Sequence, residues 1–207
     1  MMFKTQWNKR AARCLAVIVL AMGVICSSGT TGYASSTTGP GINMKAPVSR
    51  PSTNGVTIYV SKNSSILTLK QHGVEIGTYP VTMGAESSAG TKSVEGDLRT
   101  PSGEFYICTR NDKSIAYLSL GLSYPTVKDA ERGYADGIIS EAERDAIITA
   151  HKEKKQPPWD TALGGAIMIH GCREDQKPTH GCVAVDNSVM DVLWLYCNLG
   201  VPVTVGP

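Results

Sequence analysis

The sequence predicts a mainly β domain with a helical insertion, an α+β fold, from three observations. Short segments of alternating apolar and polar residues recur between residues 56 and 120, with turn residues between them. Residues 126–155 break this pattern with helical spacing and a helix-start signal. Short apolar segments then return from residue 166 onward. The 207 residues are enough for one such domain with its own core.

Five strands are predicted in the first part of the domain. In these segments β-branched and aromatic residues are frequent, as in strands that expose one face to solvent. The predicted strands cover residues 56–60, 65–70, 74–81, 105–109 and 116–120. Residues 84–103 are polar and contain several glycines, so they predict a loop between the third and fourth strands.

The insertion contains a predicted helix that begins at Ser140. Ser140 and Glu143 have the spacing of a capping box, in which each side chain accepts a hydrogen bond from the other residue's backbone N–H. The proline pair at 157–158 ends this helix, and residues 128–135 form a shorter helix before it. His151, near the end of the longer helix, is interpreted as a solvated surface residue.

The last part of the sequence predicts three strands and one helix. Residues 166–169 are all apolar, which is typical of a strand buried on both faces, and His170 follows directly. A short strand over 183–185 precedes a helix that ends near residue 199. Residues 202–205 form the final strand.

The N-terminus predicts export. Residues 1–34 contain four basic residues, then about 12 apolar residues, then small residues before a cleavage site, which is the pattern of a signal peptide. The apolar stretch is short for a membrane span, so a retained anchor is the alternative. Residues 35–55 are rich in Ser, Thr, Gly and Pro and predict a flexible linker to a folded domain over 56–207. That domain is expected in the periplasm or the cell wall.

The charge of the folded part argues against nucleic acid as a partner. The whole chain carries 20 basic and 18 acidic residues, a net charge of +2. The predicted leader holds four of the basic residues and no acidic ones, which leaves sixteen against eighteen, a net charge of −2. No basic stripe remains for a phosphate backbone.

Cysteine spacing excludes a structural metal site but leaves disulfides open. Cys108, Cys172, Cys182 and Cys197 remain after removal of the leader, and none of them forms a C-x-x-C pair. If Cys182 stays free, at most one disulfide can form among the other three, and the sequence does not specify the pair. No metal and no other cofactor is expected.

The strongest chemical signal is a histidine and a cysteine placed at predicted strand ends. His170 follows one strand, and Cys182 stands 12 positions later, where the next strand begins. A thiol attacks carbonyl carbon as the thiolate, and a nearby imidazole is the usual base that forms it. Gly181 allows close approach of a substrate, and the N–H groups of Gly181 and Cys182 are candidate donors to an oxyanion. His180 is a candidate second base or donor, and Thr179 a candidate brace for the turn.

At these residues the sequence resembles the L,D-transpeptidase (YkuD-type) catalytic domain. The resemblance lies in His-Gly at 170–171, Thr-His-Gly-Cys-Val at 179–183, and the Arg-Thr-Pro-x-Gly-x-Phe segment within 97–105. It extends over about 56–205 and implies a mixed β-sandwich or barrel with a helix after the cysteine. One departure is Ala184, where arginine or asparagine is often found, and this bears on substrate contacts rather than on the chemistry.

The resemblance also implies a role for each matching residue. Cys182 is the expected nucleophile, His170 its base, and the carbonyl of Gly171 the group that orients the imidazole. The expected oxyanion and substrate-binding side consists of Thr179, His180 and Gly181. The implied substrates, both donor and acceptor, are peptidoglycan stem peptides: the thiol displaces D-alanine, and an amine resolves the acyl-enzyme. Carbapenem-type inhibitors are implied ligands, and contact with a membrane is expected only through an uncleaved leader.

Two alternatives remain open from the sequence. The first is an L,D-carboxypeptidase or endopeptidase, in which water takes the place of the amine. The second is a non-catalytic wall-binding domain that retains the motif. The presence of both Cys182 and His170 argues against the second alternative.

Overall fold

The computed structural model describes residues 51–173 and 176–207. The chain divides into two units, Met1–Ala46 and Pro47–Pro207, and all described residues belong to the second. The predicted signal peptide and most of the predicted linker lie outside the described residues, so both stay predictions. None of the described helices combines the length and the apolar character needed to traverse a lipid bilayer.

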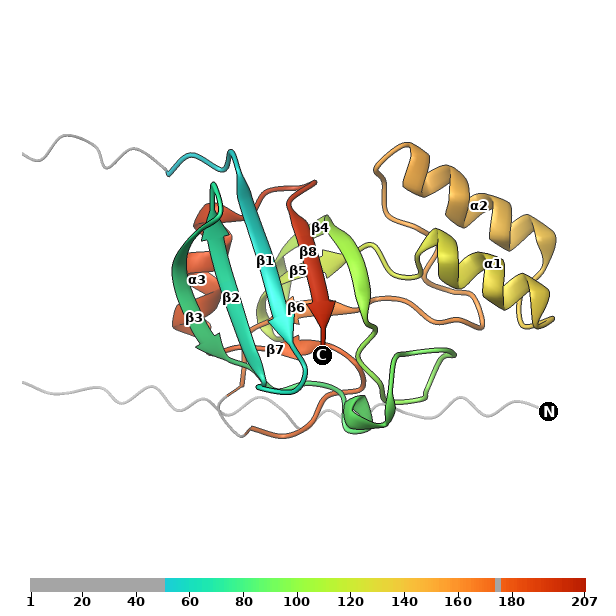
Figure 1. Ribbon diagram of the computed structural model, residues 1–207, viewed down its shortest axis with the longest axis horizontal. Coiled ribbons are helices and arrows are strands. Elements are labelled where there is room, and N and C mark those ends of the chain that lie inside the picture. The colour runs from blue at the N-terminus through green and yellow to red at the C-terminus, as the bar shows by residue number, and fades with distance from the viewer. Residues whose placement is uncertain (1–50, 174–175) are drawn as a thin grey trace, which may run out of the picture. The chain divides into compact units, whose positions relative to one another are not determined.

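Eight strands form one sheet in the order β3-β2-β1-β8-β4-β5-β6-β7 (Figure 1). The strands are β1 (Val56–Ser61), β2 (Ile66–Gln71), β3 (Val74–Pro80), β4 (Gly103–Ser114), β5 (Tyr117–Leu122), β6 (Met168–His170), β7 (Val183–Ala184) and β8 (Pro202–Gly206). All eight predicted strands are therefore present. β1 and β8 pair in parallel, as do β6 and β7, while the other neighbours are antiparallel.

The long strand β4 joins two halves of the sheet. Its first residues, from Gly103 to Tyr106, pair with β8, and its later residues, from Ile107, pair with β5 through two register shifts. The sheet bends there, so that apolar side chains from both halves meet in one core, which α3 (Asn187–Tyr196) completes with Met190 and Leu193. Burial of this alternating apolar face is the main stabilising term of such a fold.

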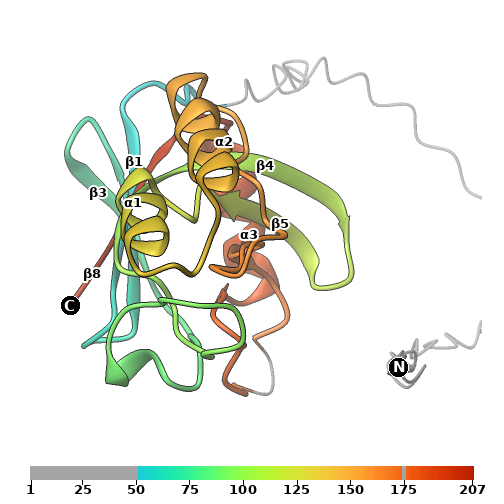
Figure 2. The same ribbon diagram turned by 90° about the vertical axis from the view of Figure 1, so that its right-hand side faces the viewer.

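The insertion is a pair of helices, α1 (Val127–Ala135) and α2 (Glu141–Lys152), which lie side by side at one end of the domain (Figures 1 and 2). The predicted capping box of Ser140 and Glu143 is present, and Thr126 and Asp129 form a second one at α1. The two helices share a small core of four buried residues: Ala130, Ile139, Ile147 and Leu163. Leu163 belongs to the segment that leads into β6, so the insertion is anchored to that segment.

The prediction of a strand buried on both faces at 166–169 is wrong. β6 contains only three residues, and burial alternates along the segment: Ile167 and Ile169 are buried, Met168 is half-buried and Ala166 is exposed. Ala166 has φ +53°, outside the strand region, so the chain turns there before it enters the sheet. β6 therefore presents one face to the core and leaves Met168 and His170 accessible on the other.

The interpretation of His151 as a solvated residue is also wrong. Its ring is half-buried, Nε2 lies 2.8 Å from the carbonyl oxygen of Pro125, and the ring packs edge-on against Tyr106 with centroids 5.5 Å apart. Both partners are distant in sequence, and helical spacing alone contains no information about them.

Candidate active site

The parallel pairing of β6 and β7 brings the predicted nucleophile next to the strand that carries the predicted base. Ile169 is opposite Val183 and His170 is opposite Ala184, so Cys182 is level with Met168. The thiol accepts a hydrogen bond from the Met168 N–H at 3.4 Å and donates to the carbonyl oxygen of Ala166 at 3.6 Å. The side chain is therefore held by backbone groups of the segment that ends in His170.

The imidazole of His170 is oriented by the next residue. Nδ1 lies 2.7 Å from the carbonyl oxygen of Gly171. A carbonyl oxygen only accepts, so Nδ1 carries the proton and Nε2 of the neutral ring is left unprotonated, as a general base requires. A side chain at position 171 does not fit, because its Cβ would lie 2.4 Å from Asn187 Oδ1 and 3.0 Å from the Ala116 carbonyl oxygen. The contact expected between Gly171 and His170 is present.

Burial governs the ionisation of the cysteines. Burial raises the pKa of the Cys182 thiol, while the Met168 N–H and the positive charge of Lys92 act in the opposite direction. Burial raises the pKa of both Cys108 and Cys197 to about 12, so these two thiols stay protonated at neutral pH. No disulfide joins Cys108, Cys172, Cys182 and Cys197 to one another in the described part of the chain.

Lys92 is a member of the site that the sequence did not reveal. Its side chain is almost fully buried, and Nζ donates to Asp97 Oδ1 and to the carbonyl oxygen of Val94, both at 2.9 Å. Its Cε lies 3.3 Å from the position that a Cβ on Gly164 would occupy, two residues before Ala166. A lysine in a polar loop is usually solvated, so only its contacts in the folded chain distinguish Lys92 from such a residue.

Asp97 fixes the loop that carries Lys92. Its carboxylate accepts hydrogen bonds from the backbone N–H groups of Ser93, Val94 and Arg99. Burial alone would raise the pKa of Asp97, but these bonds and the one from Lys92 hold it at about 2. The carboxylate therefore stays charged throughout the physiological range.

The turn before Cys182 is held by Thr179, as the sequence suggested. Its hydroxyl donates to the Cys182 carbonyl oxygen at 2.7 Å and accepts from the Gly181 N–H at 3.1 Å. The Gly181 N–H, a candidate donor to an oxyanion, is therefore already bonded to a hydroxyl near in sequence, and its role at an oxyanion stays a prediction. Within residues 51–173 and 176–207, the Cys182 N–H has no hydrogen-bond acceptor and remains available.

Gly181 itself is required by the backbone. Its φ is +133°, and a Cβ would lie 2.8 Å from the carbonyl oxygen of Arg99. His180, by contrast, is exposed at the surface of the same turn, and no hydrogen bond joins its side chain to any described residue. The structure thus gathers Cys182, His170 and Gly171 with the Thr179 turn, and leaves His180 at the edge.

One protein family model matches nearly all of the folded domain. The sequence model of the YkuD family, described as the L,D-transpeptidase catalytic domain, matches residues 55–205. A search of curated protein sequences finds no match.

Solved structures with the same fold include the helical cell shape determining protein Pgp2 from Campylobacter jejuni. Its K307A mutant has a TM-score of 0.51 and the unmutated protein 0.50, each at 20% identity over 73% of this chain and 47% of that chain. Bd1075 from Bdellovibrio bacteriovorus has a TM-score of 0.47 at 20% identity over the same shares. The chain spans about half the length of these structures, and at this identity the likeness shows the fold, which confirms the predicted fold class.

Proposed function

Because the chain belongs to the YkuD family of L,D-transpeptidase catalytic domains, we propose that it is a cysteine-dependent acyltransferase acting on peptidoglycan stem peptides. The observation that carries this proposal is the backbone-held thiol of Cys182 beside β6, which ends in a histidine whose Nε2 is left unprotonated by the Gly171 carbonyl. Nucleophile and base come from rigid neighbouring strands, as covalent catalysis needs.

In the first half-reaction, Nε2 of His170 takes the thiol proton and the Cys182 sulfur attacks the carbonyl carbon that precedes the terminal D-alanine. The Cys182 N–H donates to the oxyanion of the tetrahedral intermediate. The intermediate collapses as the C–N bond breaks, His170 returns the proton to the leaving amine, and D-alanine departs. A thioester joins the remaining tripeptide to Cys182.

In the second half-reaction, an amine of another stem peptide attacks the thioester carbon. His170 takes a proton from this amine and gives it to the leaving sulfur, so the free enzyme is restored and a new amide is formed. The resting thiol is protonated because burial raises its pKa, and the charge of Lys92 helps the sulfur to ionise. Water in place of the amine gives the L,D-carboxypeptidase or endopeptidase reaction.

The location and ligands follow from this proposal. Stem peptides lie outside the cytoplasmic membrane, in agreement with the predicted signal peptide over 1–34, so we place the folded domain in the periplasm or the cell wall. Carbapenem-type inhibitors, which acylate a nucleophile of this kind, should form a covalent adduct at Cys182.

The test is incubation of the purified protein with a stem tetrapeptide, followed by mass spectrometry, with the Cys182→Ala variant as matched control. A cross-linked dimer lacking one D-alanine identifies transfer, and a tripeptide alone identifies hydrolysis. An unchanged tetrapeptide would leave only the wall-binding alternative. Turnover that survives in Cys182→Ala would refute the mechanism outright.

A further inference from the structure

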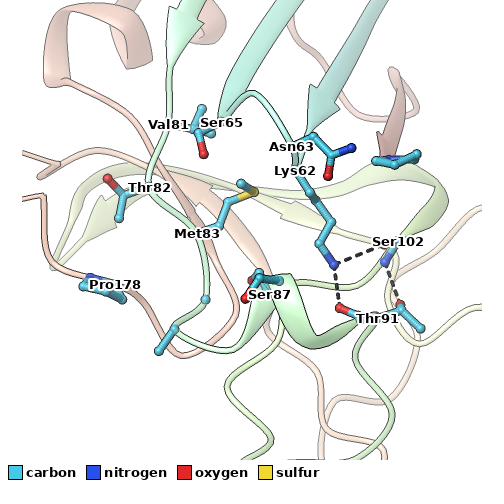
Figure 3. A pocket seen from close by; sticks show the side chains of 15 residues that line it. Lys62, Asn63, Ser65, Val81, Thr82, Met83, Ser87, Thr91, Ser102 and Pro178 are labelled. Atoms are coloured by element: carbon cyan, nitrogen blue, oxygen red, sulfur yellow. Dashed lines mark hydrogen bonds between the residues drawn. The ribbon is translucent and has the colours of Figure 1, made fainter.

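A pocket of about 650 Å³ lies between the turn that joins β1 to β2 and the segment after β3 (Figure 3). Its lining is rich in hydroxyl groups and contains Lys62 but no acidic side chain. Figure 3 shows the Lys62 side chain extending toward Ser102, which is in turn bonded to Thr91. The sequence analysis assigned nothing to this pocket.

The pocket adjoins the turn that carries the nucleophile. Thr82 and Gly84, which line it, form single β-bridges with Ala184 and Thr179. Gly84 is packed so closely against the turn that a Cβ on it would lie 3.0 Å from the Cα of Gly181. A single segment of backbone therefore separates the pocket from the turn. A few residues of extended peptide, at about 3.3 Å per residue, can cover this distance.

Lys62 supplies positive charge to the pocket, and no acidic side chain among the described residues pairs with it. Nζ donates to the carbonyl oxygens of Gly90 and Thr100, at 2.6 and 3.2 Å, and to Ser102 Oγ at 3.3 Å, which uses all three of its protons. Burial, and then the nearby charge of Arg99, lower the pKa of Lys62. Two cations thus lie close together.

Arg99 is the second cation, and it belongs to the Arg-Thr-Pro segment that the catalytic chemistry leaves unused. No hydrogen bond or ion pair joins its guanidinium to any residue in the part of the chain that the structure describes, and its Nε is buried. Nη1 lies 4.0 Å from the position of a Cβ on Gly90, which lines the pocket. The Lys62 and Arg99 side chains are both half-buried, and neither cation is paired with an acidic side chain among the described residues.

The hydroxyl groups beside Lys62 are arranged to donate. Ser102 Oγ accepts from Lys62, and Thr91 Oγ1 accepts from the Ser102 N–H at 2.8 Å. Each hydroxyl still has its own proton, which it can donate to a ligand. The hydroxyl donors and the two positive charges both favour a ligand with an acidic group.

We propose that a free carboxylate of the acidic peptide substrate binds at the Gly90 edge of this pocket, with Arg99, which lies beside that edge but does not line the pocket, as the direct partner and Lys62 as the second charge. The proposal rests on the proposed function, since it assigns a recognition site to the same substrate. Arg99 is the residue to test, because its removal breaks no bond that the structure contains and should not destabilise the fold.

The experiment compares two stem peptides that differ only in one carboxylate, which is free in one and converted to a primary amide in the other. The wild type should show a KM about tenfold lower for the acid than for the amide, as expected for a hydrogen-bonded charge. Arg99→Gln should remove this difference by raising the KM of the acid, with kcat and the KM of the amide unchanged, and Arg99→Lys should restore part of it. Lys128→Gln, the same loss of charge on an exposed face of α1, should behave as the wild type.

Equal KM values for acid and amide in the wild type would overturn the proposal, as would an undiminished preference in Arg99→Gln. Binding of both peptides to the Cys182→Ala variant, measured by calorimetry, separates this proposal from the reaction. Acid-selective binding without turnover in the wild type would refute the reaction and leave the pocket assignment standing. Turnover without acid selectivity would refute only the pocket assignment.

Discussion

The two halves of the sheet are built differently. In the half formed by β1, β2, β3 and β8, the β1–β2 pair runs through six consecutive partners without a register shift. In the half formed by β5, β6 and β7, β6 pairs with β5 through three residues and with β7 through two. His170 and Cys182, the predicted base and nucleophile, lie at these short pairings.

This difference shows how the fold separates stability from chemistry. Long, regular pairing consumes backbone N–H and C=O groups, whereas short pairing leaves some of them for a site. The N–H of Met168 and the carbonyl oxygens of Ala166 and Gly171 are such groups, and they hold the thiol and the imidazole. Substitutions in the half with long pairings should therefore change stability, and substitutions at the short pairings should change activity.

His170→Gln should give the largest change in activity. Loss of the base should lower kcat/KM on the stem tetrapeptide by roughly 10²–10⁴-fold, the usual contribution of a general base. The free energy of unfolding should change little, because the side chain is only half-buried. Steady-state kinetics and urea unfolding measure the two quantities, and an activity within tenfold of wild type would exclude His170 as the base.

Leu67→Ala should lower stability and leave activity unchanged. Leu67 lies on β2 with none of its surface exposed, so truncation should reduce the free energy of unfolding by about 2–5 kcal/mol. Activity per folded molecule should stay at the wild-type level. Thr68→Ala, on the other face of the same strand, is the matched control, and a loss of kcat in folded Leu67→Ala would show that the two halves are not separable.

Lys92→Met combined with Asp97→Asn tests whether the charge of Lys92 acts on the Cys182 thiol. Positive charge favours the thiolate, so its removal should raise the pKa of Cys182 and move the pH profile of iodoacetamide alkylation to higher pH. The double substitution leaves no unpaired carboxylate, and alkylation at neutral pH should slow severalfold. Lys128→Met should leave the profile in place; a profile unmoved in the double variant would assign Lys92 to structure alone.

Ser140→Ala should have the smallest effect. Loss of the cap on α2 should cost about 1 kcal/mol of helix stability and speed hydrogen exchange in the first turn of α2. Kinetic constants should remain those of the wild type. Thr126→Ala removes the equivalent cap on α1 and should show the same size of effect, so a markedly larger loss for one helix would reveal a difference in anchoring.

Much of the half formed by β1, β2, β3 and β8, and the neighbouring positions of His170 and Cys182, could be predicted from sequence pattern. Alternation in β1 and β2 and the capping box at Ser140 are local signals, and the structure confirms them. The spacing of His170 and Cys182 at two strand ends is also local, and their neighbouring positions follow once β6 and β7 pair.

What could not be predicted depends on contacts between distant segments. β4 extends from Gly103 to Ser114 because it pairs with β8 at one end and β5 at the other, and no pattern within it indicates two partners. Residues 166–169 are all apolar, so the sequence did not indicate that one face of this segment is accessible to solvent. Lys92 differs from a solvated lysine only through Asp97 and the segment near Gly164.

Leu163 links parts of the molecule that have different tasks. Its side chain closes the small core of α1 and α2, its carbonyl oxygen accepts from the Tyr124 hydroxyl at 3.1 Å, and three residues later Ala166 contacts the thiol. The packing of α1 and α2 is therefore connected, through three peptide units, to the backbone carbonyl that accepts from the Cys182 thiol.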